Sequence, residues 1–209
     1  MLQSLNKRSF GSEFMSATQR NSRRLTQMRA VAERLFRDKG YLATSMRDIA
    51  DEMQLKGGGS LYAHIKGKED LLWSIANEAT DAFFNALEAV CAQPATPYER
   101  LRAAMIAHLL VITEHLGAAA VYFDEWRHLS EPRRSQFMAR RDAYEKQFQA
   151  LLEACIASGA CRALDTRLAT LHLLSAMNAM RHWYKPNGRL SAQQVAESLA
   201  DMLLHGLCA

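Results

Sequence analysis

Apolar residues recur at steps of three and four along almost the whole chain, and the strict alternation typical of β-strands is nearly absent. In an α-helix this spacing places the side chains on one face, where they can be buried together. The first such stripe lies on a helix of about residues 20–39, which Gly40 ends, and consists of Leu25, Met28, Val31, Ala32, Leu35 and Phe36. The sequence therefore predicts an all-α protein.

Capping residues, glycines and prolines divide the remainder of the chain into further helices. Thr44 or Ser45 can cap a short second helix, and Pro94 and Pro97 mark a linker after the fourth. We expect these further helices at about 44–54, 60–65, 68–91, 98–115, 118–129, 131–158, 165–184 and 191–207. The predicted architecture has nine helices, with a three-helix head, a connecting helix and a larger helical body.

The expected boundary between head and body falls at the start of the connecting helix. Residues 15–67 form the head and residues 68–209 the body. The segment Gly11-Ser12-Glu13-Phe14 is what two adjoining restriction sites encode, and Met15 follows it directly. We therefore interpret residues 1–14 as a vector-derived tag and leave them out of the fold.

Composition places the chain among cytoplasmic globular proteins. Its hydrophobic content is 49%, which is ample for a packed core. No apolar run approaches the ~18 residues needed to span a bilayer, and the N-terminus lacks a signal-peptide pattern. The spacing of the four cysteines fits neither a zinc site nor a disulfide framework, which predicts buried thiols in a reducing compartment, at Cys91, Cys155, Cys161 and Cys208.

Positive charge gathers in the first third of the chain. Residues 1–72 carry 13 Lys and Arg against 8 Asp and Glu, a net of +5, whereas the remainder carries 13 against 14, a net of −1. A basic segment beside a near-neutral body is typical of a head that binds a polyanion. A solvated basic face without a partner is the alternative.

The stretch "GGGSLYAHIKGK", residues 57–68, raises the question of a phosphate-binding loop. A nucleotide-binding P-loop needs Gly-x-x-x-x-Gly-Lys-Ser/Thr after a strand. Here Glu69 follows Gly67-Lys68, Tyr62 stands where the first glycine belongs, and no strand precedes the stretch. The sequence excludes a P-loop on all three counts.

A helix-turn-helix fits the same residues better. Two short helices joined by a tight turn let the second enter the DNA major groove while the first lies across the backbone. Arg47, Tyr62, His64 and Lys68 are donors suited to phosphate oxygens, and glycines before the second helix let the backbone approach the duplex.

The segments "TSMRDIADEMQL" (Thr44–Leu55) and "SLYAHIKGKEDLL" (Ser60–Leu72) resemble the DNA-binding domain of the tetracycline-repressor (TetR) family. The resemblance covers about residues 24–72. It implies a homodimer whose two heads contact successive major grooves of a palindromic operator in double-stranded DNA. The turn Lys56–Ser60 is one residue longer than the usual family turn, so the register of base-reading residues does not transfer.

The expected DNA contacts divide into base-edge and phosphate contacts. Lys56, Ser60 and the glycine backbone are assigned to base edges. The whole expected set is Thr44, Ser45, Arg47, Lys56, Gly57, Gly58, Gly59, Ser60, Tyr62, His64, Lys66 and Lys68, of which the last four are assigned to phosphates. For Tyr62 the alternative is a half-buried packing residue, and for Lys66 a free surface charge.

The body is expected to bind a small molecule. "VYFDEWRHLSEPRRSQFMARRDAYEKQF" (Val121–Phe148) and "NAMRHWYKPNGRLS" (Asn178–Ser191) are similar to a branch of the family that responds to acyl-coenzyme A thioesters or related lipid and aromatic catabolites. Apolar residues from several helices could line a pocket, and arginines could take a phosphate or carboxylate. The alternative is that the apolar positions form solid core.

The expected ligand-binding residues are Met105, His108, Leu109, Ile112, Tyr122, Phe123, Trp126, Arg127, Phe137, Arg141, Tyr144, Phe148, Asn178 and Arg181, with Arg140 as a further candidate for an anionic group. The last two helices carry more apolar residues than one bundle can bury. We therefore expect a dimer interface at Leu168, Leu171, Leu174, Leu199, Met202 and Leu203.

Two other classes of protein were weighed. Glu125-x-x-His128 has the spacing of a di-iron carboxylate site, but such a site uses two copies and the sequence holds one. A helical scaffold without a DNA role is the other alternative. The sequence favours a cytoplasmic, ligand-responsive transcriptional repressor that is not an enzyme and uses no cofactor, with operator DNA, a hydrophobic effector and a second copy as partners. By hypothesis, the effector shifts the helix that begins at Lys68 and thereby releases the DNA.

Overall fold

The computed structural model describes residues 17–54 and 65–206, and within these residues every regular element is helical. The helices are α1 (Ala17–Lys39), α2 (Met46–Glu52), α3 (Lys68–Cys91), α4 (Pro97–Glu114), α5 (Leu116–Asp124), a 3-10 helix (Trp126–His128), α6 (Arg133–Ala157), α7 (Thr166–Asn178), α8 (Met180–Trp183) and α9 (Ala192–His205). The predicted all-α class is confirmed. The third predicted helix, 60–65, falls almost wholly outside the described residues.

Side-chain caps explain why several helices begin where they do. Ser45 caps α2, because its hydroxyl accepts from the Asp48 backbone N–H while the Asp48 carboxylate accepts from the Ser45 N–H. Thr96 and Glu99 form the same reciprocal pair before α4, where Pro97 occupies the first turn. Ser191 and Gln194 repeat it before α9.

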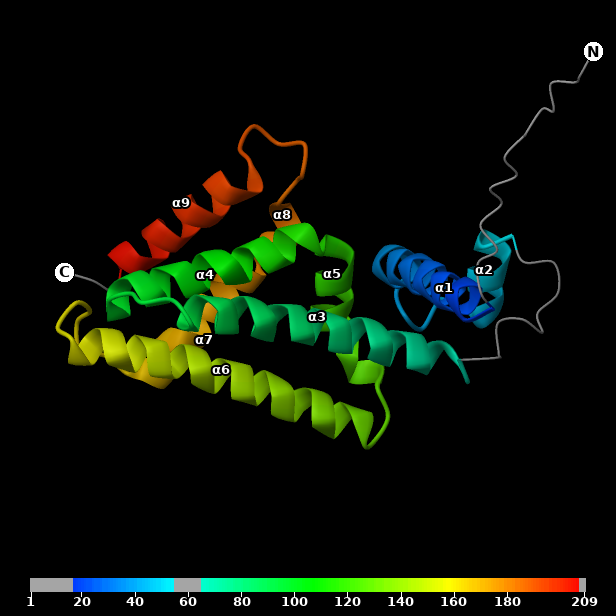
Figure 1. Cartoon of the computed structure of the whole chain (residues 1–209), viewed down its shortest axis with the longest axis horizontal. Helices are drawn as coiled ribbons and strands as arrows, with labels where there is room; N and C mark the ends of the chain where they lie inside the picture. The colour runs from blue at the N-terminus through cyan, green and yellow to red at the C-terminus, as the bar shows by residue number, and fades with distance from the viewer. Residues whose placement is uncertain (1–16, 55–64, 207–209) are drawn as a thin grey trace, which may run out of the picture.

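Helix α3 joins the head to the body (Figure 1). Helices α1 and α2 lie at the end where α3 begins, and α4, α5 and α6 pack along the rest of its length. Helix α9 packs on α4, and α7 packs on α6 and α4. The buried face of α3 runs the whole way and consists of Leu71, Leu72, Ile75, Ala76, Ala79, Thr80, Phe83 and Leu87. One continuous hydrophobic core therefore includes residues of both head and body.

Ion pairs fix the outer helices of the body. Arg102 on α4 makes a bidentate pair with Asp201 on α9, at 2.6 Å from Nε and 2.9 Å from a terminal nitrogen. Arg140 on α6 donates to Asn77 and Asp81 on α3 at 2.8 and 2.6 Å. Each pair crosses between helices far apart in sequence, so together they fix how α9 and α6 lie on the central helices.

Two predicted helices are interrupted. The one expected at 118–129 ends as α5 at Asp124 and continues as the 3-10 helix. The one expected at 165–184 breaks at Ala179 into α7 and α8, and the Arg181 guanidinium donates to the freed Asn178 carbonyl at 2.7 Å. In the described residues no single helix is long and apolar enough to cross a membrane; α4 and α5 reach that limit only as a pair, which meets at a bend of 101°.

The head has a small core that depends on Phe36, which is wholly buried on α1 and meets the Tyr41 ring edge-on at 5.2 Å. We expect Phe36→Ala to lower the free energy of unfolding by about 3–5 kcal/mol. Leu42→Ala, nearby but 73% exposed, should change it by less than about 0.5 kcal/mol. Chemical denaturation of both variants makes the comparison, and equal effects would contradict this description of the head core.

Candidate functional site

The exposed start of α2 is the described part of the expected DNA-binding surface. Arg47 is exposed, and its only ion pair among the described residues is a weak one, 3.7 Å from Asp51 one turn later. Ser45 is exposed at the helix N-terminus, and Lys66 is exposed before α3. Lys56, Gly57, Gly58, Gly59, Ser60, Tyr62 and His64 were also predicted here, and they lie outside the described residues.

Two residues predicted to contact DNA have other partners in the structure. Thr44 is 1% exposed, and its hydroxyl donates to the Gly40 carbonyl at 2.9 Å. The Lys68 ammonium donates to the carbonyls of Tyr41 and Thr44, at 2.9 and 3.0 Å, and lies 4.3 Å from the centre of the Tyr41 ring. Both groups are therefore directed into the head, which corrects their assignment to DNA.

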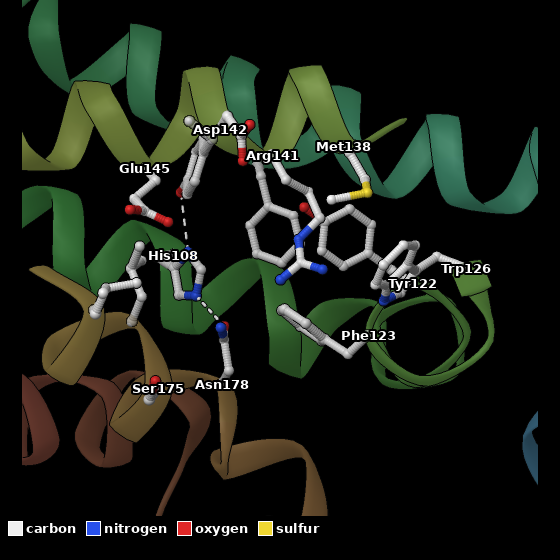
Figure 2. Close-up of a pocket in the computed structure, with 14 residues that line it drawn as sticks. His108, Tyr122, Phe123, Trp126, Met138, Arg141, Asp142, Glu145, Ser175 and Asn178 are labelled. Atoms are coloured by element: carbon white, nitrogen blue, oxygen red, sulfur yellow. Dashed lines mark hydrogen bonds between the residues drawn. The ribbon is translucent and has the colours of Figure 1, made fainter. Parts of the chain in front are cut away.

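The body contains a cavity of about 230 Å³ between α4, α5, α6 and α7 (Figure 2). Aromatic rings form most of its apolar wall. Its lining consists of Phe83, His108, Tyr122, Phe123, Trp126, Met138, Arg141, Asp142, Tyr144, Glu145, Leu171, Leu174, Ser175 and Asn178. Apolar walls with a few polar groups are typical of small-molecule sites.

His108 supplies a neutral polar group at the wall of this cavity. Its Nδ1 lies 3.0 Å from the Tyr144 hydroxyl and its Nε2 lies 2.9 Å from Asn178 Oδ1, as Figure 2 shows. Phe83 stacks on the imidazole with ring centres 4.8 Å apart. A neutral ring satisfies both contacts, because Nε2 donates to the amide oxygen while Nδ1 accepts from the hydroxyl. Burial lowers the pKa of His108 to about 4, against the smaller opposing effect of the Asn178 hydrogen bond.

The tyrosines near His108 are also held neutral. Burial raises the pKa of Tyr122 to about 12, which Arg141 and Arg140 partly oppose. Burial likewise raises the pKa of Tyr144 well above its usual value. At neutral pH the inner wall of the cavity therefore combines uncharged rings with hydroxyl and amide groups.

Arg141 brings a positive charge to the cavity. Its guanidinium extends from α6 into the space between the rings in Figure 2, with Cζ 5.4 Å from the centre of the Trp126 ring. The described residues offer Arg141 no ion-pair partner within 4.0 Å, although Asp142 and Glu145 also line the cavity. A guanidinium placed over an aromatic face, without an ion-pair partner, is available to bind an anionic group.

The other arginines predicted for the ligand do not line this cavity. Arg140 binds Asn77 and Asp81, as described above. Arg181 pairs with Asp124 at 2.9 Å and covers the Phe123 ring at 4.9 Å. Arg127 is exposed on the 3-10 helix. Of the four candidate arginines, Arg141 is the one that lines this cavity.

Half of the expected ligand-binding set lines the cavity: His108, Tyr122, Phe123, Trp126, Arg141, Tyr144 and Asn178. Five others are buried but do not line it, so they belong to the core: Met105, Leu109, Ile112, Phe137 and Phe148. The sequence interpretation missed Phe83, which reaches the cavity from α3, and the second faces of α6 and α7. Steps of three and four along each helix, starting from Arg141 and Asn178 and continuing from the residues so reached, identify these faces: Met138, Asp142, Glu145, Leu171, Leu174 and Ser175.

The residues predicted for a dimer interface lie on α7 and α9. Leu168 is 67% exposed and Met202 is 71% exposed, and Leu171 is also exposed. Leu174, Leu199 and Leu203 are half-buried.

In the part of the chain that the structure describes, no group of three or more His, Cys, Asp and Glu side chains could hold a metal ion, and Glu125 lies 3.5 Å from His128 as an isolated pair.

Two family profiles match this chain. The profile described as "Bacterial regulatory proteins, tetR family" matches residues 29–75, and the profile described as "Tetracyclin repressor-like, C-terminal domain" matches residues 94–207. The first match covers most of the head and the start of α3, and the second covers the body after α3.

Relatives and solved structures match over nearly the whole length. The HTH-type transcriptional repressor KstR2 of Mycobacterium tuberculosis H37Rv is 32% identical over 193 residues, which is 91% of this chain and 96% of that protein. The structure of ketosteroid transcriptional regulator KstR2 of Mycobacterium tuberculosis has a TM-score of 0.84 at 30% identity, covering 89% of this chain and 95% of that chain. The crystal structure of AibR in complex with isovaleryl coenzyme A and operator DNA has a TM-score of 0.76 at 30% identity, covering 86% and 97%.

The neutral state of His108 makes a prediction about pH. Because burial lowers the pKa from 6.5 to about 4, the stability tied to the neutral ring is present above pH 6.5 and is lost as the pH falls toward 4. His108→Gln removes the titrating group. Between pH 7 and pH 4, we expect wild type to lose about 3 kcal/mol more unfolding free energy than the variant loses. Urea denaturation at both pH values tests this, and equal losses would show that His108 is not held neutral.

Proposed function

The chain belongs to the tetR family of bacterial regulatory proteins, and on that premise we propose that it represses transcription from a palindromic operator and is released by a small hydrophobic effector. The protein acts in the cytoplasm as a homodimer. The observation that carries the proposal is the cavity of the body, because it joins aromatic walls and neutral polar groups to the one positive charge of Arg141.

The cavity supports an effector with an apolar body and an anionic or strongly polar group. Its 230 Å³ lies below the ~300–1,000 Å³ of sites that enclose a drug-sized molecule. An acyl-coenzyme A would therefore place its acyl group inside and its nucleotide part outside. The exposed side chain of Met138, which lines the cavity, marks the side on which a ligand would emerge. AibR, crystallised with isovaleryl coenzyme A and operator DNA, supports this class of effector.

The exposed apolar face of α7 and α9 supports a homodimer. Leu168, Leu171 and Met202 would be covered by the same residues of a second copy, as in a two-fold interface between pairs of helices. Leu171 also lines the cavity, so the effector would lie directly behind this face. Arg47 and Ser45 on α2 would then contact the DNA backbone.

Two alternatives fit the observations less well. A di-iron enzyme needs a second carboxylate-histidine pair, and among the described residues Glu125 and His128 have none beside them. A helical scaffold would need neither a cavity lined by aromatic rings nor, within it, an arginine that has no ion-pair partner among the described residues. The compared relatives are named as regulators and repressors of transcription, which favours regulation over both.

The test is a thermal-shift series with acyl-coenzyme A esters of graded length, followed by gel shifts on operator DNA with the best ligand. We expect that ligand to raise Tm and release the DNA. Arg141→Ala should weaken its binding at least about tenfold, because a charge-assisted contact is lost. Arg127→Ala, the same change on an exposed arginine, should alter it by less than about twofold.

The outcomes separate the parts of the proposal. Equal weakening in the two variants would contradict the assignment of the charge to Arg141. A wild-type protein that shifts no DNA, including its own upstream region, would overturn the proposal of repression.

A further inference from the structure

A five-residue segment, residues 126–130, contacts both the effector cavity and the head. It consists of the 3-10 helix Trp126–His128 followed by Leu129 and Ser130. At its first residue, the Trp126 ring lines the cavity, stacks on Phe137 at 5.8 Å and lies under the Arg141 guanidinium. A ligand that binds Arg141 inside the cavity would therefore lie close to Trp126.

Two residues later the same segment touches the head. The His128 ring stacks on the Tyr41 ring, with centres 5.4 Å apart and planes inclined by 13°. Tyr41 is buried at the end of α1, and both its ring and its carbonyl hold the Lys68 ammonium. The His128 ring therefore contacts Tyr41, the residue through which Lys68 of α3 binds the head.

The end of the segment contacts the first turn of α3. The backbone N–H and the hydroxyl of Ser130 both donate to Glu69 Oε1, at 3.1 and 2.7 Å. Glu69 directly follows Lys68. The segment thus binds the two elements that meet at the Lys68 ammonium, one through His128 and the other through Ser130.

The helix before the segment is held at its start. The Glu33 carboxylate of α1 lies over the first turn of α5, so close that a Cβ at Gly117 would be 2.1 Å from Glu33 Oε1. The N–H of Ala118 donates to this carboxylate, whose pKa is raised by burial against the opposing effects of Arg37, His115 and Arg29. The start of α5 is therefore held against α1, whereas its other end leads directly into residues 126–130.

We propose that residues 126–130 transmit effector binding from the cavity to the head, with His128 and Tyr41 as the positioning residues. Displacement of Trp126 by a ligand turns the 3-10 helix, which shifts the His128–Tyr41 stack and tilts α1 and α2 relative to α3. This inference rests on the proposed ligand-responsive repression. It specifies a route that differs from a shift of α3 alone, which also reaches the cavity through Phe83.

The experiment measures coupling apart from either binding event. Operator DNA is selected from random duplexes with the full-length protein, and the ligand probe is the acyl-coenzyme A ester that raises wild-type Tm most, in a series that begins with isovaleryl coenzyme A. The coupling is the ratio of operator Kd with saturating probe to operator Kd without it. The Kd of the probe itself is measured in parallel.

Three histidine variants test whether the coupling depends on the aromatic ring at position 128. His128→Ala removes the stacking ring, His128→Phe keeps an aromatic ring in its place, and His182→Ala makes the same deletion on an exposed residue of α8. We expect the coupling ratio to fall at least about fivefold in His128→Ala and to stay near the wild-type ratio in the other two. The Kd of the probe should change by less than about twofold in all three.

Several results would overturn the proposal. An unchanged ratio in His128→Ala, with a clear wild-type response, would refute this route and leave the proposed function intact. A wild-type ratio of one for every probe would refute ligand-responsive repression and the route together. If His128→Ala does not fold, Glu69→Ala removes both Ser130 hydrogen bonds and should lower the ratio; failure to do so would equally refute the route.

Discussion

The burial of one face of α3 along its whole length is the constraint on which the rest of the molecule depends. Leu71 and Leu72 at its start and Phe83 and Leu87 near its end belong to the same continuous core. Lys68 adds polar contacts at the first turn, where its ammonium donates to the carbonyls of Tyr41 and Thr44 in the turn between α1 and α2. Since burying such a stripe contributes several kcal/mol, head and body are parts of one cooperative structure rather than two domains on a flexible linker.

The cavity lies beside this helix, between α4, α5, α6 and α7. Burial keeps His108, Tyr122 and Tyr144 uncharged in its wall, and Arg141 places a positive charge over the Trp126 ring. The carboxylates of Asp142 and Glu145 also line the cavity. We propose that an anionic effector binds beside this guanidinium, because electrostatic attraction is stronger in a partly buried site than in bulk water. The same cavity borders the exposed face of α7 and the 3-10 helix, so a few side chains connect the proposed ligand site with the proposed dimer face and with the head.

Helix positions could be predicted from sequence because their signals are local. The start of α3 at Lys68 and its end at Cys91 agree with prediction, and the capping pairs Thr96–Glu99 and Ser191–Gln194 fix two further helix starts. Which arginine serves the cavity could not be predicted, because it depends on partners distant in sequence. Arg140 and Arg181 look equivalent to Arg141 in the sequence, yet carboxylates 59 and 57 residues away bind the first two. Thr44 and Ser45 differ for a similar reason, since only tertiary packing decides which hydroxyl is buried.

Spin labels on the two heads test most directly whether the body controls their separation. Cys91 is exposed, which corrects its prediction as a buried thiol. Leu42→Cys, with Cys91→Ser and Cys208→Ser, would place one nitroxide on each exposed head position of a dimer. Pulsed electron–electron double resonance then measures the distance between the two labels on operator DNA. The same distance is measured again after the effector is added. We predict a narrow distance distribution on the operator, set by half-sites ~34–36 Å apart, and a displaced distribution with the effector. Identical distributions in the two states, or no dipolar coupling at all, would contradict the account.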